Sequence, residues 1–284
     1  MLKAQTILFM LYDNTIAIYI LLDDILQAIE HKENLHRQVN DAMVMTTALV
    51  GAWYFGGNWE TARSYMQRHH CPEMLSKSRF NRRLHTLALC CEQCFRLLGW
   101  VFKSSQTRQH YVLDTFPVAL SHNIRIHRCR LVQGEDYRGR NASKREYFYG
   151  YKVALLINSE GLPVELAFIP GSYAEQSALA RLDFDLPTGS GVWQDSGFTD
   201  DEWQDFYLEN EGIEFVTQRK KNALRGDDFP TYIAKKQNRK RVETSISEIT
   251  RRFPKRIHAV TIEGFQFKVF LFILAFAIIK YFQI

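Results

Sequence analysis

Residues 147–171, YFYGYKVALLINSEGLPVELAFIPG, constrain the fold most, because two apolar runs flank one short polar turn. Val, Ile, Leu, Tyr and Phe fill both runs and favour strands, whereas the tetrapeptide NSEG at 158–161 has turn composition. Two such runs joined by a short turn are typical of a β-hairpin. The stretch therefore predicts two antiparallel strands, and with them a sheet.

The segments around this hairpin predict the rest of a layered domain. Further strands are expected at 110–118, ending near Pro117, at 191–198 and at 213–218. Helices are expected at 174–182, at 200–211 and from about 231 to 253, where Pro254 stops the last one. The order strand, strand, strand, helix, strand, helix, strand, helix is that of a mixed α/β layer fold.

The first 105 residues have a different pattern of apolar residues. Apolar residues recur there at three-to-four spacing with few Pro or Gly, which predicts an all-helical N-terminal domain followed by the α/β domain at 106–284. One helix is expected over 76–98, with Phe80, Leu84, Leu87 and Cys91 as its buried stripe. The arginines that flank this stripe are candidates for contact with DNA or else a solvated face: Arg79, Arg82 and Arg83.

The charge of the chain favours an anionic partner. The formal net charge is only +5, which does not distinguish nucleic acid from a membrane surface. Its distribution is more informative, because residues 235–256 hold nine basic and two acidic residues. By contrast, residues 183–228 hold twelve acids and four basic residues.

Other function classes are disfavoured by length and spacing. The run VFLFILAFAII at 269–279 is too short for the roughly 20 residues that span a bilayer, so it predicts a buried helix or strand. GEDYRGRN at 134–141 lacks the Lys and Ser/Thr of a phosphate-binding loop. The odd number of cysteines, five, fits a reducing cytosol, and Cys91 and Cys94 are interpreted as packed thiols because no second ligand pair completes a zinc site.

Three carboxylates fall into comparable places. Asp114 lies inside an apolar strand, Asp195 lies at the end of another, and Glu243 lies on the basic helix at the border of its buried face. A buried unpaired carboxylate costs several kcal/mol, so such acids are usually paired with cations or bind metal. Local roles are the alternatives: a turn before Pro117 for Asp114, an Asx turn for Asp195 and a pair with Arg239 for Glu243.

Charge balance favours a metal site made of all three acids. Two divalent cations about 4 Å apart carry four positive charges, which three carboxylates and one phosphodiester would balance. One cation lowers the pKa of the attacking water or hydroxyl, and the other stabilises the leaving oxygen. The surrounding cations would hold a polyanion against the cleft: Arg239, Lys240, Arg241, Arg251, Arg252, Lys255 and Arg256.

These residues resemble a known family. The stretches YVLDTFPV, GLPVELAFIPGS, QDSGFTD and KRVETSISEITRRFPKRIHAVTIEGF are similar to the DDE transposases of small bacterial insertion sequences, most closely those of family 982. The similarity covers about residues 110–284, and the catalytic acids of the family fall on Asp114, Asp195 and Glu243. Many relatives carry His-Asp where this chain has Ala174–Glu175.

The resemblance implies a specific activity. It implies a ribonuclease-H-like mixed sheet flanked by helices, dependence on Mg²⁺ for which Mn²⁺ can substitute, and an N-terminal domain that binds element ends. It also implies cleavage of double-stranded DNA at terminal inverted repeats, attack of the 3′-hydroxyl on target DNA, a homodimer on DNA and a cytoplasmic, nucleoid-associated location. A nuclease without strand transfer and a non-catalytic repressor left by a decayed element are the alternatives.

Overall fold

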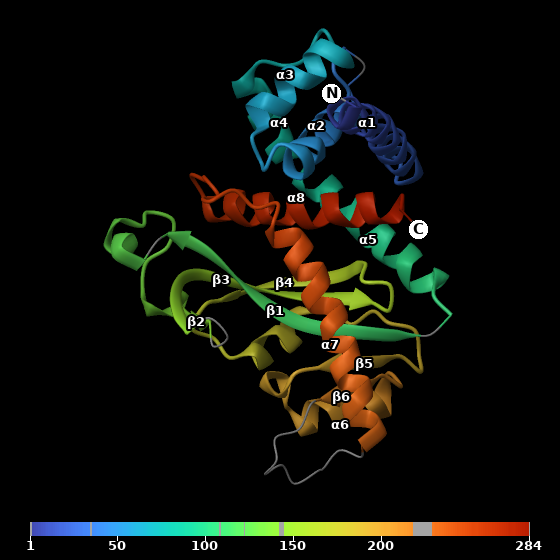
Figure 1. The fold of residues 1–284 in the computed structure, drawn as a ribbon, viewed down its shortest axis with the longest axis vertical. Coiled ribbons are helices and arrows are strands. Elements are labelled where there is room, and N and C mark those ends of the chain that lie inside the picture. Colours follow the sequence, from blue (N-terminus) through green and yellow to red (C-terminus); the bar gives the residue numbers. More distant parts are fainter. Residues whose placement is uncertain are drawn as a thin grey trace. The chain divides into compact units, whose positions relative to one another are not determined.

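The computed structural model of the chain describes residues 2–34, 36–107, 109–121, 123–141, 145–217 and 229–283, with side chains from residue 10 on except those of 123 and 229–239. It divides the chain into two compact units, one made of residues 1–98 and 249–284 and the other of residues 99–248. This division differs from the single domain boundary at 105/106 that was expected from the sequence, because the C-terminal helix packs with the N-terminal helices. Figure 1 gives the labels used below.

The first unit is helical. Its helices are α1 (Leu2–Ala28), α2 (Asp41–Tyr54), α3 (Trp59–His69), α4 (Lys77–Thr86), the first part of α5 (Ala88–Ser105) and α8 (Ile262–Tyr281). Helix α2 is at the centre, because it contacts α1, α3, α4 and α8 and nearly all of its residues are buried. Within this unit Cys94 of α5 is buried, which raises the pKa of its thiol to about 12.

Helix α8 contains the apolar run of the C-terminal region. The run was expected to form a buried helix or strand, and it forms a helix that extends beyond the run at both ends. Among the described residues α8 alone is long and apolar enough to cross a membrane, yet 78% of that stretch is buried inside the protein. Such burial is typical of a core helix of a globular fold.

A buried carboxylate organises the polar contacts of the helical unit. The side chain of Asp41, at the start of α2, is 1% exposed and accepts hydrogen bonds from Arg37 and Arg83, with an Arg83 Nη2 to Asp41 Oδ1 distance of 2.6 Å. His31 Nε2 lies 2.9 Å from the other carboxylate oxygen. Arg83 also reaches Glu33 Oε1 at 2.5 Å, and burial raises the pKa of Glu33. The charge of Asp41 is thus compensated where water cannot solvate it.

We expect Asp41→Asn to destabilise the helical unit by about 3 kcal/mol, because it leaves the largely buried guanidinium of Arg83, which is 13% exposed, without its full partner. Glu60→Gln is the matched control, since Glu60 is 46% exposed and its pair with Arg63 contributes at most about 1 kcal/mol. Urea denaturation of both variants followed by circular dichroism measures the difference. Equal losses for the two variants would contradict this role of Asp41.

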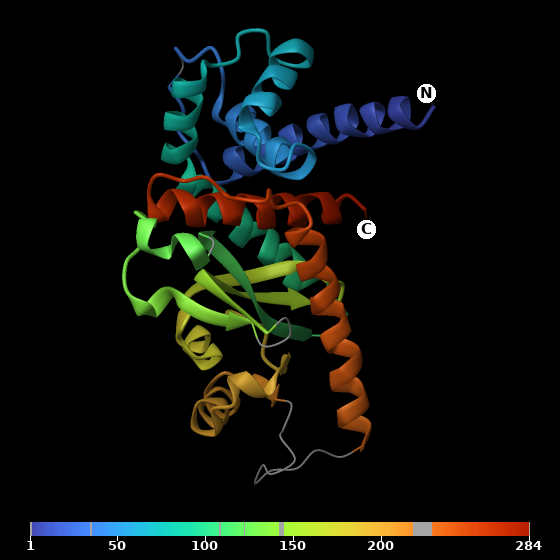
Figure 2. The same cartoon turned by 60° about the vertical axis from the view of Figure 1, so that its left-hand side comes forward.

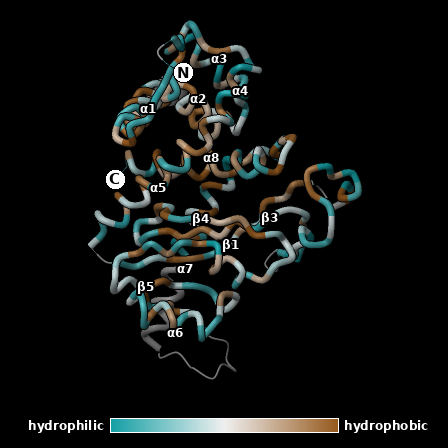
Figure 3. The backbone as a smooth tube through the Cα atoms, turned by 180° about the vertical axis from the view of Figure 1, so that it is seen from behind, coloured by the Kyte–Doolittle hydropathy of each residue, from teal (hydrophilic) through white to brown (hydrophobic). Residues whose placement is uncertain are grey.

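The second unit is built on one mixed sheet. Its strands are β1 (His110–Ser121), β2 (Arg138–Asn141), β3 (Glu146–Asn158), β4 (Pro163–Pro170), β5 (Gly191–Gln194) and β6 (Glu214–Thr217). The order is β2-β3-β1-β5-β6, with β4 also paired to β3. Strand β3 pairs antiparallel with β1, β2 and β4, whereas β5 pairs parallel with β1 and β6. Figure 3 shows hydrophobic residues along much of β3 and β4.

The hairpin expected at 147–171 is present. Strands β3 and β4 are joined by the turn at 158–161, where Asn158 Oδ1 accepts hydrogen bonds from the backbone N–H groups of Glu160 and Leu162. Gly161 has φ of 87°, a conformation that favours glycine. The mixed α/β architecture predicted from the order of elements is therefore confirmed.

Four element boundaries differ from the expectations. Strand β1 continues past Pro117 to Ser121, because beyond Leu113 it has no hydrogen-bonded partner on its β5 side, and a residue without N–H is tolerated at such an edge. The helix expected over 76–98 is two helices that meet at Leu87. The strand expected over 191–198 ends at Gln194, and the helix expected over 174–182 is the 3-10 helix η3 (Glu175–Arg181).

Helices cover both sides of the sheet. Helix α6 (Asp201–Asn210) lies against β5 and β6, where Gln204 Nε2 donates to Thr217 Oγ1 at 2.8 Å and Gln194 Nε2 donates to the same oxygen at 2.8 Å. Helix α7 (Phe229–Thr250) runs along the other side, as Figure 2 shows. One side of the sheet is therefore covered by α6 and the other by α7. The position of Asp114, Asp195 and Glu243 is described below relative to these two sides.

Candidate active site

The parallel pairing of β1 with β5 places two of the predicted acids next to each other. The register pairs Val112 with Trp193 and Leu113 with Gln194, so the next position pairs Asp114 with Asp195. Asp195 keeps an extended backbone, with φ of −77° and ψ of 165°, although β5 itself ends one residue earlier. Neighbouring strands lie about 4.8 Å apart, and register partners face the same side. Two carboxylates thus share one face of the sheet.

Local hydrogen bonds fix the backbone around both aspartates. The backbone N–H of Thr115 donates to Asp114 Oδ1 at 2.7 Å, and that of Ser196 donates to Asp195 Oδ1 at 2.6 Å. Asp195 therefore also has the local turn role considered as an alternative, since it caps the 3-10 helix η4 (Ser196–Phe198). Both side chains are half-buried. A local bond through Oδ1 is compatible with a second role, because each carboxylate has two oxygens.

Helix α7 lies on the aspartate side of the sheet. Gln194 and Leu113 alternate with the aspartates and face the opposite side, where α6 packs. Because α7 lies opposite α6, it shares the face of Asp114 and Asp195 (Figure 2). Ser245 Oγ donates to the carbonyl oxygen of Gly161 at 2.9 Å and ties α7 to the hairpin turn. Glu243, the predicted third acid, therefore belongs to the helix that covers the sheet face of Asp114 and Asp195.

Glu243 itself is exposed on α7. Val242 and Ser245 beside it are buried, so Glu243 stands at the border of the buried face, as its place in the helical pattern indicates. In the described part of the chain, no group of three or more His, Cys, Asp and Glu side chains lies close enough to hold a metal ion. Asp114 and Asp195 fit a divalent cation by ligand type and by adjacency. The site with all three carboxylates stays a prediction.

A fourth carboxylate supports this region from the other side of the sheet. Thr115 follows Asp114 and therefore faces the opposite side, where its Oγ1 donates to Glu175 Oε1 at 2.8 Å. The second oxygen of Glu175 lies so close to Gly197 that a Cβ there would be 1.9 Å away. Glu175 thus contacts the residue after Asp114 and the turn after Asp195. In the sequence, Ala174–Glu175 stands out only because the resembling family has His-Asp at this position. No pattern in the sequence predicts that Glu175 contacts Thr115 and Gly197.

We expect Glu175→Ala to reduce the rate of the predicted DNA cleavage on the order of ten-fold, because the two aspartates lose their common contact with Glu175 and small displacements at an active site are costly. Glu175→Gln keeps an acceptor for Thr115 and the shape of the side chain, so it should restore most of the rate. DNA affinity without metal should stay unchanged in both variants. Single-turnover cleavage and filter binding measure the two quantities, and equal rates for Ala and Gln would contradict a positioning role.

The predicted DNA-binding residues differ in their environments. Most of them are exposed in the structure: Arg79, Arg82, Lys240, Arg241, Arg251, Lys255 and Arg256. The side chain of Arg239 lies outside the described residues. Exposure makes these side chains available to a polyanion and leaves their assignment to DNA as a prediction.

Two of the predicted contacts already have partners inside the helical unit. The guanidinium of Arg83 is 13% exposed and bonded to Asp41 and Glu33, so we leave Arg83 out of the proposed DNA surface. Arg252 stacks on the Trp53 ring with its guanidinium carbon 3.9 Å from the ring centroid, and donates to the Trp53 carbonyl oxygen. Sequence spacing alone shows neither pairing, because both depend on residues far apart in the chain.

The comparison with protein families now gives the class of the protein. Residues 104–251, just over half of the chain, match the family model described as a transposase DDE domain. The chain belongs to this family, and the protein is a transposase. The matched range contains β1 to β6 and the whole of α7, and with them all three predicted acids. Neither the search of curated proteins nor the search of solved structures gave a match.

Proposed function

We propose that this transposase cleaves phosphodiester bonds at the ends of an insertion sequence and joins the resulting 3′-hydroxyl ends to target DNA. The observation that carries the proposal is the adjacency of Asp114 and Asp195 across the β1–β5 pair, with α7 on the same face. Assignment to the insertion sequences of family 982 rests on the resemblance of the sequence. It remains part of the proposal.

The sheet order supports a ribonuclease-H-like catalytic unit. Three antiparallel strands, β4, β3 and β1, continue into two parallel strands, β5 and β6. The connection before β5 contains η3 and the connection before β6 contains α6, and parallel pairing requires crossover connections of this kind. We further propose that the helical N-terminal region binds the element ends, although the helical unit itself includes residues 249–284.

The chain would hold its metal ions through carboxylates. Asp114 and Asp195 supply two neighbouring ligands, and Glu243 is the third ligand from α7. Mg²⁺, or Mn²⁺ in its place, supplies a nucleophile of lowered pKa and stabilises the leaving oxygen when bound. The half-buried aspartates are held in orientation by the N–H groups of Thr115 and Ser196, so the ligands need little reorganisation before reaction.

The basic residues would bring DNA to these carboxylates. Lys240 and Arg241 lie on α7 within one turn of Glu243 and are exposed. Their charge would attract the phosphate backbone and offset the repulsion between DNA and the acids. We propose a homodimer on DNA, because an element has two ends, and a cytoplasmic, nucleoid-associated protein.

We expect Asp114→Asn, Asp195→Asn and Glu243→Gln each to reduce cleavage by at least on the order of 10²-fold, because each removes one metal ligand. Binding to element ends should persist in all three. Glu248→Gln is the control, since it removes a carboxylate from the same helix five residues further on. Cleavage of labelled element ends in Mg²⁺ provides the measurement. Activity at the wild-type level in any one of the three variants removes that residue from the site.

We expect Arg241→Gln and Arg251→Gln to weaken DNA binding and to lower the slope of log K against log salt by about one for each lost phosphate contact. Arg68→Gln is the matched control, because Arg68 is exposed on α3 and outside the predicted set. Arg252 is unsuitable here, since its replacement also removes the stacking on Trp53. A slope that stays at the wild-type value would show that Arg241 and Arg251 do not contact DNA.

Two other functions remain open to test. A nuclease would cut element ends and fail to join a precleaved 3′-hydroxyl end to target DNA. A non-catalytic repressor would bind ends and cut nothing, and the exposure of Glu243, outside any three-carboxylate group among the described residues, favours keeping this alternative. An assay with precleaved ends and Mg²⁺ separates all three activities.

A further inference from the structure

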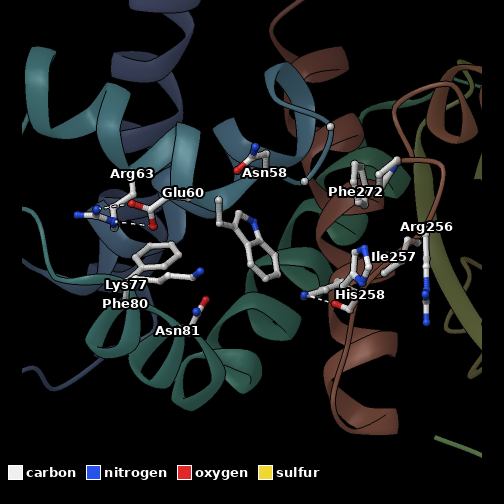
Figure 4. Close-up of a pocket in the computed structure, with 15 residues that line it drawn as sticks. Asn58, Glu60, Arg63, Lys77, Phe80, Asn81, Arg256, Ile257, His258 and Phe272 are labelled. Carbon is white, nitrogen blue, oxygen red and sulfur yellow. Dashed lines mark hydrogen bonds and ion pairs between the residues drawn. The ribbon is translucent and has the colours of Figure 1, made fainter. Parts of the chain in front are cut away.

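A second candidate site lies in the helical unit, and none of the three predicted acids lines it. It is a cavity of about 490 Å³ lined by the turn at 56–58, the starts of α3 and α4, the segment 254–258 and α8. Figure 4 shows Arg63, Lys77 and Phe80 on one side of it, and His258 and Phe272 on the other. The residues that form it therefore come from both ends of the chain, although all belong to the same compact unit.

The cavity carries an excess of positive charge. Its lining includes Arg63, Lys77, Arg256 and Lys268, and Glu60 is the carboxylate among them. Glu60 is already paired with Arg63 Nη2 at 2.5 Å, a hydrogen bond that lowers the pKa of Glu60. Within the described residues, Lys77, Arg256 and Lys268 have no carboxylate within ion-pair distance. Three cations around one concave surface attract an anion.

Lys268 is the best-defined of these cations. It is half-buried on α8, donates a hydrogen bond to the carbonyl oxygen of His258 and places its Nζ 4.6 Å from the centroid of the Trp59 ring. Burial lowers the pKa of Lys268, and no carboxylate among the described residues compensates its charge. A bound anion would stabilise the charged ammonium group.

The remaining lining is mixed. Asn58, Asn81 and His258 are polar, whereas aromatic and aliphatic side chains form an apolar wall: Trp59, Phe80, Ile257 and Phe272. Phe80 and Phe272 are 1% and 4% exposed and close the inner part of the cavity, so their ring faces are covered and cannot stack on a base. Gly57 permits the approach of Phe272, because a Cβ at Gly57 would lie 3.0 Å from that ring. The site thus combines cations with an apolar wall. This combination suits an anionic group attached to a body that has apolar C–H groups, such as the phosphate of a deoxyribose, better than it suits a free inorganic ion.

We propose that this cavity binds one phosphate-bearing nucleotide of a DNA strand that is unpaired at that point, with Lys77, Arg256 and Lys268 attracting the phosphate and the apolar wall receiving the sugar. The volume lies within the range of pockets that enclose a single small ligand, so a duplex cannot enter. The end of a single strand or a frayed nucleotide can enter the cavity. The inference rests on the proposed action on DNA, and it adds a contact that the acids of the other unit do not make.

The test uses the full chain without metal, so that its result is independent of cleavage. Fluorescence anisotropy compares a blunt duplex with the same duplex carrying a short 5′-phosphorylated overhang. We expect tighter binding of the overhang, on the order of ten-fold, and a loss of most of this preference in Lys77→Gln and Lys268→Gln. Arg68→Gln is the matched control, because Arg68 is exposed on α3, lies outside the predicted DNA-binding set and does not line the cavity.

Each outcome decides the proposal. Equal binding of the two duplexes, or an equal effect of Lys77→Gln and Arg68→Gln on the preference, would overturn it. A free deoxynucleoside monophosphate serves as competitor. If it bound this cavity more tightly than the overhang does, the ligand would be a free nucleotide and the DNA assignment would be wrong. Because Lys77 is exposed, its variant should fold even if Lys268→Gln does not, and thermal unfolding checks both.

Discussion

The short parallel ladder between β1 and β5 is the constraint on which the catalytic proposal depends. Only four residue pairs form it, from His110 with Gly191 to Leu113 with Gln194, and the aspartates stand one position beyond its end. A shift of one residue in this register would move one aspartate to the opposite face of the sheet. The contacts of Glu175 with Thr115 and Gly197 connect the two strands just past this point, and so oppose such a shift.

The carboxylates of the two compact units have different surroundings. In the helical unit the Asp41 carboxylate is buried and matched by arginines, which makes it a structural group. In the sheet unit Asp114 and Asp195 remain half-buried beside each other. Two neighbouring carboxylates repel each other, which a bound cation relieves. A matched cluster such as the one around Asp41 stabilises a fold, and this matching distinguishes Arg83 from the exposed Arg79.

Much of the fold was predictable because it depends on local patterns. The hairpin at 147–171, the alternation of later strands and helices, and the helical character of the first 105 residues all follow from the periodicity of apolar residues. The extension of β1 past Pro117 was not predictable, since it depends on where a distant strand stops pairing. The same holds for the sites: Asp114 and Asp195 stood out by their strand context, whereas Glu175, Arg83 and the cavity around Lys268 depend on contacts between remote segments.

The discontinuity of the helical unit has a consequence for synthesis on the ribosome. Helix α2 ends at Tyr54, while α8, which packs on it, begins only at Ile262. The apolar face of α2 therefore emerges long before its partner, and contacts so distant in sequence form slowly. The sheet unit, continuous from 99 to 248, can complete its contacts first. Completion of the helical unit thus waits until α8 has been synthesised, and a chain that lacks α8 leaves the apolar face of α2 without this partner.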